Sequence, residues 1–488
     1  MINKLFSFFL AIIILLCILV TDFSSAQEVK IDYLMKNVKF LSSKELWGRL
    51  AGSDGYYKAA NYSKNEFEKF GLKPIFNGSY FQKFYIEFND ITGPCELYIK
   101  RGNTMYPFEL GKDFVCRGFT GSGKIEAEVV FCGYGFSEPD YDDYSNIDVR
   151  GKIVMIFKQI PSWKLNENSW NSSLRYRANV AYQKGAIGTI LVSKPLDPQV
   201  QKPIGSVMDG EGTMLLNYPH IHIDTLVANE ILVNCIYDLA TLQRIIDSTK
   251  KPFSINTNTI AKISVKANYD PHRETMNVGG IIEGNDSILK KTYVVIGAHL
   301  DHVGGQAGKI YFPGANDNAS GSSAVLEIAR LLSQKKDKLK RSVIFMLFSN
   351  EESGLQGSQY FVDNCPVPLN DIVAMINLDC IAYGDSIKVG NGKSCPVLWE
   401  TVRKIDKQTT QLMTEDTWFG GGADAQAFHN AGIPSIYFVT TNSYQHLHLT
   451  TDTPETLNEK LFSAVVNLAY KTAFNLLTEN YQREKIIK

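Results

Sequence analysis

The sequence predicts an α/β protein with a mixed, mostly parallel central sheet flanked by helices, and with a small β-rich domain inserted into it. From residue 277 onward, short β-branched runs alternate with longer segments of helical periodicity. This alternation favours a sheet covered by helices on both faces. Residues 119–265 interrupt the pattern with short β-type runs and a Pro- and Gly-rich segment. His and acidic residues follow several predicted strands, where open α/β sheets place their binding residues.

The N-terminal residues 1–26 have the layout of a secretory signal peptide. Lys4 precedes an apolar run over 5–20, and Ser24-Ser25-Ala26 supplies small residues before Gln27. The run is shorter than the roughly 20 residues that a membrane span needs. We therefore expect cleavage after Ala26, export to the periplasm or the medium, and no stable membrane insertion afterwards. A retained membrane anchor is the alternative.

Length, charge and cysteine content limit the classes of protein to which this chain could belong. The 488 residues are enough for more than one domain. Lys plus Arg is 50 and Asp plus Glu is 51, with no long basic run, so we expect no nucleic-acid partner. The seven cysteines outside the predicted signal peptide are widely spaced and form no Cys-x-x-Cys pair, which argues against a disulfide framework and against zinc on a Cys cluster. Nothing in these patterns indicates an oligomeric state.

The first two thirds of the chain contain fewer regular signals. Residues 30–72 are amphipathic and predict helical structure that ends at Gly71, a residue suited to a helix C-terminus. A strand is predicted over 81–88. Within 119–265 we predict three strands, at 127–132, 153–157 and 188–192, and one helix at 174–184.

The C-terminal part has the clearest strand and helix pattern. The β-branched runs are four to seven residues long and suit buried strands. Predicted strands occupy 278–282, 293–298, 342–348, 372–378, 386–389 and 434–439, and predicted helices occupy 319–334, 353–363 and 396–408.

One stretch, 294–321, holds the first candidate site residues. His299 and Asp301 end a predicted strand, and their spacing places both side chains on one face of an extended chain. A metal-binding imidazole needs an acceptor for its other ring N–H, which Asp301 could supply. Asp317 follows in a Gly- and Asn-rich turn. Taken singly, a His-x-Asp after a strand is more typical of a surface hydrogen bond than of a metal site, and an Asn-Asp-Asn is more typical of a turn or helix N-cap.

Four further strand ends or helix starts carry ionisable residues. Glu351 and Glu352 follow the strand at 342–348, and Asp379 follows the strand at 372–378. Asp424 opens a helix, and His448 follows the last predicted strand. Only eight His residues occur in the chain, and half of them lie at these strand ends, namely His299, His302, His446 and His448.

Imidazole and carboxylate groups that converge at one sheet edge suit zinc, cobalt or manganese. Two ions about 3.5–4 Å apart would need one bridging carboxylate and further ligands for each ion. The alternative for the paired Glu residues is a helix cap that meets the helix dipole. The convergence therefore predicts a divalent-metal site.

The same residues stand in motifs that resemble a known family. The motifs are His-x-Asp at 299–301, Asn-Asp-Asn-Ala-Ser-Gly at 316–321, Asn-Glu-Glu-x-Gly at 350–354, Asn-x-Asp at 377–379 and His-x-x-x-Asp-Thr at 448–453. In this order they resemble the secreted zinc aminopeptidases with a co-catalytic metal pair, of the aminopeptidase S and aminopeptidase Y type. The resemblance covers roughly residues 275–475, and Gly-Arg-Leu-Ala-Gly-Ser at 48–53 resembles the family's N-terminal motif.

The resemblance implies a zinc-peptidase α/β/α sandwich that removes N-terminal residues from peptides with two zinc ions per chain. His299 and Asp379 would bind one ion, Glu352 and His448 the other, and Asp317 would bridge them. It implies Glu351 as the general base, Asp301 as the group that orients His299, and a cis peptide bond after Asp317. Cys380 stands where Met is common, and the Pro common shortly after the last His is absent. We also expect His302 and His446 either to support the ligands or to lie on the surface. We expect Asp424 to be a hydrogen-bond acceptor near the site.

The inserted region resembles a protease-associated domain. Gly133-Tyr134-Gly135 and the stretch 149–154 are typical of that domain. We expect it to act as a lid or spacer without chemistry of its own. The predicted organisation is a signal peptide at 1–26, two peptidase-domain segments at 27–118 and 266–488, and the protease-associated insert at 119–265.

Three alternatives to the two-zinc aminopeptidase remain. A glutaminyl cyclase shares the fold but uses a single zinc ion, and the intact Asp317, His299 and Glu351 argue against it. A receptor-like binding module with the same fold has lost the ligands, whereas here none is missing. A carboxypeptidase that acts on acidic dipeptides is the third.

Overall fold

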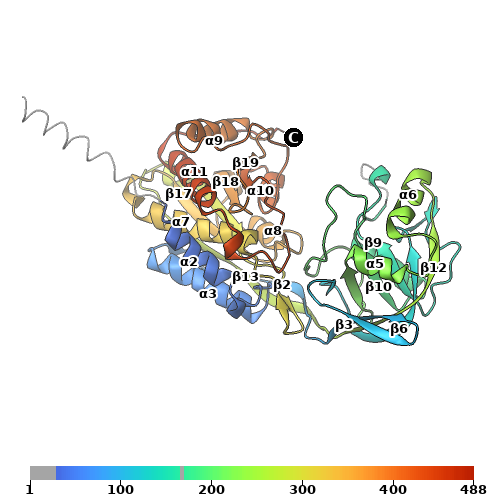
Figure 1. The fold of residues 1–488 in the computed structure, drawn as a ribbon. Coiled ribbons are helices and arrows are strands. Elements are labelled where there is room, and N and C mark those ends of the chain that lie inside the picture. The colour runs from blue at the N-terminus through green and yellow to red at the C-terminus, as the bar shows by residue number, and fades with distance from the viewer. Residues whose placement is uncertain (1–28, 165–169, 488) are drawn as a thin grey trace, which may run out of the picture.

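The computed structural model describes residues 29–164 and 170–487, which form two lobes (Figure 1). Each lobe is built around one eight-stranded sheet. The predicted signal peptide lies outside the described residues. Among the helices within the described ranges, none is both long and apolar enough to cross a membrane.

The sheet of the first lobe is mixed, with parallel pairing at its centre. Its strand order is β1-β13-β17-β14-β18-β20-β19, and β2 also pairs with β13. The central strands β17, β14, β18 and β20 are parallel to one another, whereas β13 and β19 are antiparallel to their neighbours. The expected mixed α/β fold is thus confirmed, with the parallel part confined to four central strands. The strands are β1 Lys73–Pro74, β2 Phe81–Asp90, β13 Asn268–Ile282, β14 Tyr293–His299, β17 Ser342–Phe348, β18 Ile372–Leu378, β19 Ile387–Gly390 and β20 Ser435–Thr440.

Helices cover both faces of this sheet (Figure 1). Alternate residues of β14 and β17 point into two separate apolar cores, because successive side chains of a strand face opposite ways. Ile296 and Phe345 belong to the core that includes residues of α2, α3, α7 and α11. Val295 and Met346 belong to the core that includes residues of α8 and α10. The helices are α2 Ile31–Leu41, α3 Asp54–Lys69, α7 Gly321–Ser333, α8 Gln356–Asp363, α9 Pro396–Gln408, α10 Ala425–Asn430 and α11 Glu459–Thr478.

The sheet of the second lobe has the order β4-β3-β12-β6-β9-β10-β11-β5. Its strands β6, β9, β10 and β11 are also mutually parallel. The sheet includes β3, β4 and β5, which precede residue 119. The strands are β3 Cys95–Arg101, β4 Thr104–Phe108, β5 Phe114–Cys116, β6 Gly123–Cys132, β9 Ile153–Phe157, β10 Gly188–Val192, β11 His220–Ile223 and β12 Ser254–Val265, and the helices are α4 Leu174–Gln183, α5 Thr225–Ile231 and α6 Leu239–Thr249.

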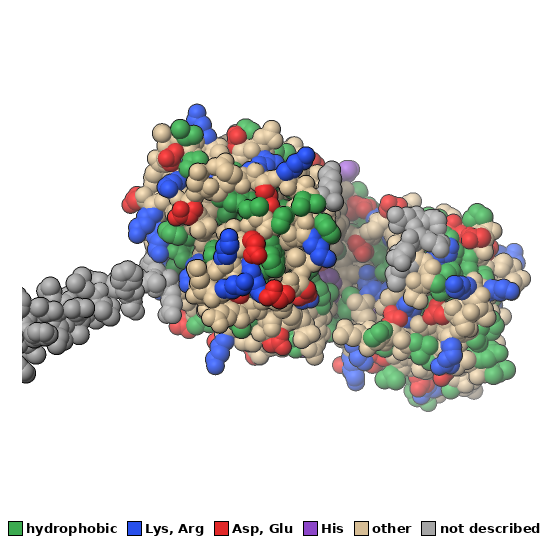
Figure 2. Space-filling view, turned by 90° about the horizontal axis from the view of Figure 1, so that it is seen from above, with side chains coloured by type: hydrophobic (Ala, Val, Ile, Leu, Met, Phe, Trp, Pro, Cys, Tyr) green, Lys and Arg blue, Asp and Glu red, His purple; other side chains and the backbone are tan. Residues whose placement is uncertain are grey.

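Two antiparallel strands connect the lobes. The chain leaves the first lobe along β2 and returns along β13, and these strands pair from Phe81↔Val278 to Asp90↔Asn268. Gln306 of the first lobe both accepts from the backbone N–H of Cys116 and donates to its carbonyl oxygen, at 2.9 and 2.7 Å. The space-filling view shows His side chains between the lobes (Figure 2).

Short pieces complete the structure. Two small hairpins are β7 Ser137–Glu138 with β8 Tyr141–Asp142, and β15 Gly305–Gln306 with β16 Ile310–Tyr311. The segment Ala315–Ser320, whose backbone is not helical at Asp317 and Asn318, precedes α7. Single 3-10 turns occupy Lys44–Leu46, Ser162–Lys164, Leu289–Lys291, Lys336–Lys338, Leu369–Asp371 and Pro454–Thr456.

Candidate metal centre

The candidate residues meet at the carboxyl ends of the central parallel strands of the first lobe. His299 is the last residue of β14, and Asp379 directly follows β18. Glu351 and Glu352 follow β17 within a few residues. Parallel strands end at the same edge of a sheet, so residues distant in sequence come together there.

His299 lies among three carboxylates. Its Nε2 atom is 3.3 Å from Asp317 Oδ1, 3.4 Å from Asp379 Oδ1 and 4.0 Å from Glu351 Oε2. One ring N–H cannot donate to three acceptors at once. Asp379 Oδ1 is buried and has no hydrogen-bond partner among the described residues. This donor group therefore offers more negative charge than the protein itself neutralises.

A second donor group shares Asp317 with the first. His448 Nε2 is 2.8 Å from Glu352 Oε2 and 3.2 Å from Asp317 Oδ2. His302 Nδ1 lies 2.8 Å from the other oxygen of Glu352. The ligand-type atoms of these four residues all lie within 4.8 Å of one another. The two oxygens of Asp317 thus face different donor groups.

The pKa shifts of these groups reflect burial together with the many carboxylates around the two imidazoles. Burial by itself lowers the pKa of His299, but the neighbouring Glu351 and Asp379 carboxylates raise it well above the usual value. The pKa of His448 is raised in the same way against burial, chiefly by Glu352. Burial raises the pKa of Glu351. Glu352 has its pKa lowered to about 2, because its interactions with His448 and His302 outweigh burial and the Asp317 charge.

These observations fit divalent metal ions. Four ligands about 2.0–2.2 Å from a tetrahedral zinc ion lie roughly 3.3–3.5 Å from one another. The distances of 3.3 and 3.4 Å from His299 Nε2 to Asp317 and Asp379 agree with this spacing. Imidazole nitrogen and carboxylate oxygen are the donors that zinc, cobalt and manganese accept.

The turn that holds Asp317 is shaped by its neighbours in sequence. The Asp317–Asn318 peptide bond is cis, as the resemblance implied. The Asn318 side chain donates to Leu378 O at 3.0 Å and accepts from the N–H of Gly321 at 2.8 Å. A Cβ atom at Gly321 would lie 2.1 Å from Leu378 O, so only glycine lets the start of α7 approach β18 this closely. The Asn-Asp-Asn-Ala-Ser-Gly motif therefore specifies the backbone around Asp317.

Buried polar groups hold the ligand-bearing backbone in place. The carboxylate of Asp452 accepts from the N–H groups of Asn316 and Asp317 at 2.9 and 3.0 Å. The guanidinium of Arg49, which is fully buried, donates to Leu300 O, Pro313 O, Gly314 O and Asp317 O. Arg49 lies in the motif at 48–53, and Asp452 lies in the last motif, but sequence reasoning gave neither a role.

Asp301 contacts the candidate ligand His299 and the backbone of Glu351 and Glu352. The Nδ1 atom of His299 is 3.2 Å from the main-chain oxygen of Asp301 and 3.8 Å from its carboxylate. The expected acceptor was the carboxylate, yet the main-chain oxygen is nearer. The carboxylate instead accepts from the N–H groups of Glu351 and Glu352 at 3.2 and 3.4 Å.

Four residues near the site clarify the remaining expectations. His302 was expected to support the ligands or to lie on the surface, and it is fully buried within the second donor group. His446 lies outside both donor groups and contacts Thr451 Oγ1 at 2.9 Å. Asp424 is fully buried, and burial raises its pKa to about 7. Burial raises the pKa of Cys380 well above its usual value, so the thiol beside Asp379 stays protonated.

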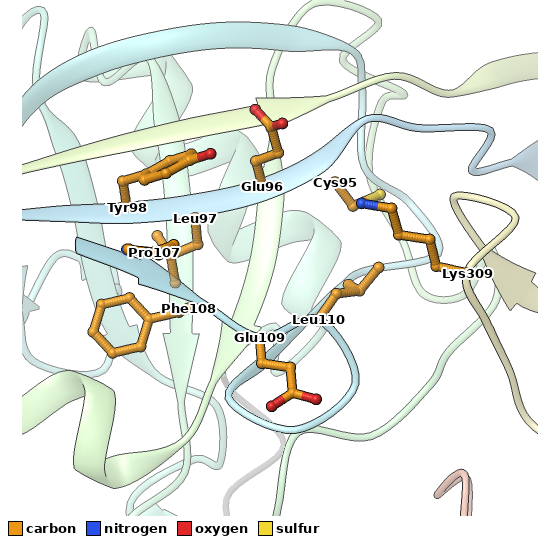
Figure 3. Close-up of a pocket in the computed structure, with 9 residues that line it drawn as sticks. All are labelled: Cys95, Glu96, Leu97, Tyr98, Pro107, Phe108, Glu109, Leu110 and Lys309. Carbon is orange, nitrogen blue, oxygen red and sulfur yellow. The ribbon is translucent and has the colours of Figure 1, made fainter. Parts of the chain in front are cut away.

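A cleft of about 980 Å³ adjoins this centre, lined by residues of both lobes. A smaller pocket of about 390 Å³ lies on the second lobe beside β3 and β4 (Figure 3). Its lining includes Cys95, Tyr98 and Lys309, and none of the described donor-group residues contributes to it. No described donor-group residue lines the cleft either, but its lining residues Leu447 and Leu449 flank His448, so the cleft, unlike the smaller pocket, lies next to the centre.

Comparison with known proteins agrees with this geometry. Residues 277–473 match the sequence model of Peptidase family M28. A probable leucine aminopeptidase from Arthroderma otae is 31% identical over 193 residues, which are 37% of this chain and 54% of that protein. Aminopeptidase YwaD of Bacillus subtilis is 34% identical over 179 residues, which are 34% of this chain and 36% of that protein. The chain thus spans about half, or less, of the length of the curated relatives it matches.

Solved structures extend the similarity in fold to both lobes. An aminopeptidase from Aneurinibacillus sp. strain AM-1 has a TM-score of 0.65 at 19% identity, covering 94% of this chain and 96% of that chain. A zinc aminopeptidase from Bacillus subtilis has a TM-score of 0.62 at 19% identity, covering 94% of this chain and 98% of that chain. Residues 277–473, which carry the donor groups, are the part of the chain that matches the Peptidase family M28 model.

Proposed function

We propose that the protein is a metallo-exopeptidase, an aminopeptidase that hydrolyses the N-terminal residue of peptides at a centre of two zinc ions. The observation that carries this proposal is the position of Asp317 between two donor groups, with one carboxylate oxygen directed to each. A shared carboxylate is what a pair of ions about 3.5–4 Å apart requires. The names of the relatives, leucine aminopeptidase and zinc aminopeptidase, support the reaction and the metal.

The proposed ligands follow the two donor groups. His299 and Asp379 bind one ion, and Glu352 and His448 bind the other. Asp317 bridges the ions. His302, at 2.8 Å from Glu352, fixes the orientation of that carboxylate. Cobalt or manganese would suit the same donors.

In this proposal Glu351 is the general base. Zinc, when bound, lowers the pKa of water and polarises the scissile carbonyl group. Glu351 takes a proton from the attacking water and passes it to the leaving amine. Asp301 positions Glu351 through the bond to its N–H, and it positions His299 through its main-chain oxygen. Asp452 and Arg49 hold the backbone of Asp317, so the bridging carboxylate keeps its orientation.

The domain and export assignments belong to the same proposal. We propose that 1–26 is a signal peptide that directs the protein to the periplasm or the medium, and that 119–265 is a protease-associated insert. The small-residue site before Gln27 supports the former. The second sheet, which the chain enters from β2 and leaves into β13, supports an inserted domain, and its strands β3, β4 and β5 extend that domain to residues before 119.

The first experiment is a count of zinc per chain in purified protein comprising residues 27–488, after gentle dialysis, together with hydrolysis of a panel of aminoacyl substrates. Two ions and release of N-terminal residues are the expected result. A single ion that stays single after zinc is added back would favour a cyclase-like centre instead. Protein that retains no metal and regains none would overturn the proposal and favour a binding module.

A further inference from the structure

The cleft beside the metal centre has walls from both lobes. The residues at 199–202 and Ile204 come from the segment of the second lobe between β10 and β11. The opposite wall comes from β19, β20, Trp418 and the turn at 440–449. Leu447 and Leu449 flank His448, so one end of the cleft adjoins the second donor group.

One hydrogen bond and one apolar cluster join the second-lobe wall to the first lobe, and a further bond holds the wall within the second lobe. The N–H of Gly205 donates to the carbonyl oxygen of His448 at 2.8 Å. Ser206 Oγ accepts from the N–H of Gly118 at 2.9 Å. Val207 packs in an apolar cluster with Val303 and with other residues of both lobes. These contacts hold the second-lobe segment in place as one wall of the cleft beside the metal centre.

The ionisable residues along the cleft have one sign. Two lysines, Lys202 and Lys388, line it, and none of its described lining residues is Asp or Glu. Lys202 Nζ is 3.0 Å from Asp224, and Lys388 Nζ is 2.9 Å from Asp416, but neither carboxylate lines the cleft. Such partly exposed ion pairs contribute little to stability, so an incoming carboxylate can replace the partner.

We propose that this cleft selects short peptides with a free C-terminal carboxylate, which Lys202 and Lys388 bind from opposite walls. The inference rests on the proposed function, since the metal centre holds the N-terminal residue and the lysines then meet the other end of the substrate. A volume of about 980 Å³ lies at the upper end of sites for small ligands, which suits a few residues rather than a long chain. Lys202 and Lys388 are thereby specificity-determining residues of the cleft.

The test compares Leu-Gly-Gly with Leu-Gly-Gly amide, which share the N-terminal residue and the scissile bond. We expect the wild-type protein to hydrolyse the free acid with about 10-fold higher kcat/KM, through a lower KM at similar kcat. In the double variant Lys202→Gln/Lys388→Gln this preference should fall close to one. The control is Lys83→Gln, since Lys83 is also an exposed lysine paired with a carboxylate, Glu274, but lies on β2 outside the cleft.

Calorimetric binding of both peptides to zinc-loaded Glu351→Gln protein separates this inference from the proposed function. If neither peptide is hydrolysed by the wild type, the aminopeptidase proposal fails, but the ratio of the two affinities still decides the role of the lysines. Equal affinities for acid and amide, or a preference that the double lysine variant leaves intact, would overturn the inference.

Discussion

The two lobes contain the same structural element and use it differently. Each sheet has four mutually parallel strands, and polar residues follow the carboxyl ends of those strands in both lobes. In the first lobe these residues are carboxylates and imidazoles with too few hydrogen-bond donors between them. In the second lobe they include Lys158 after β9, Lys194 after β10 and Asp224 after β11.

Two buried cations of the second lobe, Arg177 and Lys194, bind acceptors within the protein. The guanidinium of Arg177 donates to the carbonyl oxygens of Tyr134, Phe157 and Lys158. Lys194 donates to Ile160 O at 3.3 Å and pairs with Asp197 at 3.1 Å. Parallel strands therefore determine where polar residues gather, and the balance of donors and acceptors determines whether an external cation is needed.

The change expected to have the largest effect removes the shared carboxylate of the first lobe. Asp317→Asn should lose at least one metal ion and nearly all activity, because both donor groups use this side chain. Metal per chain by mass spectrometry of the native protein is the measurement. The matched control is Asp143→Asn in the second lobe, which should keep its metal. Full occupancy in Asp317→Asn would refute the bridging role.

The second prediction separates chemistry from metal binding within the same lobe. Glu351→Gln should keep its metal but lower kcat by about 10²–10⁴-fold, because an amide cannot accept the proton of the attacking water. Turnover on a leucyl substrate and zinc content are measured on the same sample. Unchanged turnover would remove Glu351 from its proposed role.

The third prediction concerns the contact between the two lobes. Val207→Ala should loosen the interlobe apolar cluster and with it the bond from Gly205 to His448. We expect the zinc affinity of the site that includes His448 to fall by about 10-fold, the lower range for groups that support a ligand. Chelator competition measures this affinity. Leu216→Ala, at an exposed residue of the same segment, is the control, and equal affinities in the two variants would show that the lobes act independently.

The last prediction concerns the stability of the second lobe and not the metal centre. Asp143 is buried and accepts from the N–H groups of Tyr134 and Phe136, and burial raises its pKa to about 7 from 3.8. The folded state therefore keeps this proton over a pH range in which the unfolded state has lost it. The contribution of Asp143 to the free energy of unfolding should fall as the pH rises from about 4 to about 7, by at most about 1.4 kcal/mol per pH unit.

Asp143→Asn removes that titration. The difference in unfolding free energy between wild type and variant, measured by denaturant titration at several pH values, should favour the variant progressively towards pH 7. A difference that stays constant from pH 4 to 7 would show that Asp143 titrates normally.

Much of the first lobe was predictable from local sequence. The predicted strands at 342–348 and 372–378 and the predicted helix at 396–408 agree with β17, β18 and α9 in both bounds. All residues of β17 and β18 are buried, so each is a continuous apolar run with a clear start and end. In contrast, β12 alternates between exposed and buried residues, and its pairing with β3 and β6 joins segments far apart in sequence. Sequence reasoning missed it together with β3, β4, β5, β11 and the C-terminal helix α11.

The sequence by itself determined the motifs that carry the candidate ligands and the class of fold that holds them, because both depend on short-range patterns of residue type. Tertiary structure alone decided that His302 faces Glu352, that Arg49 caps four carbonyl oxygens near Asp317, and that a segment of the second lobe holds the carbonyl of His448. These contacts join residues between 50 and 268 positions apart, or residues of different lobes. The local sequence around these residues does not indicate which distant groups they will contact, because those contacts depend on how the two sheets are assembled.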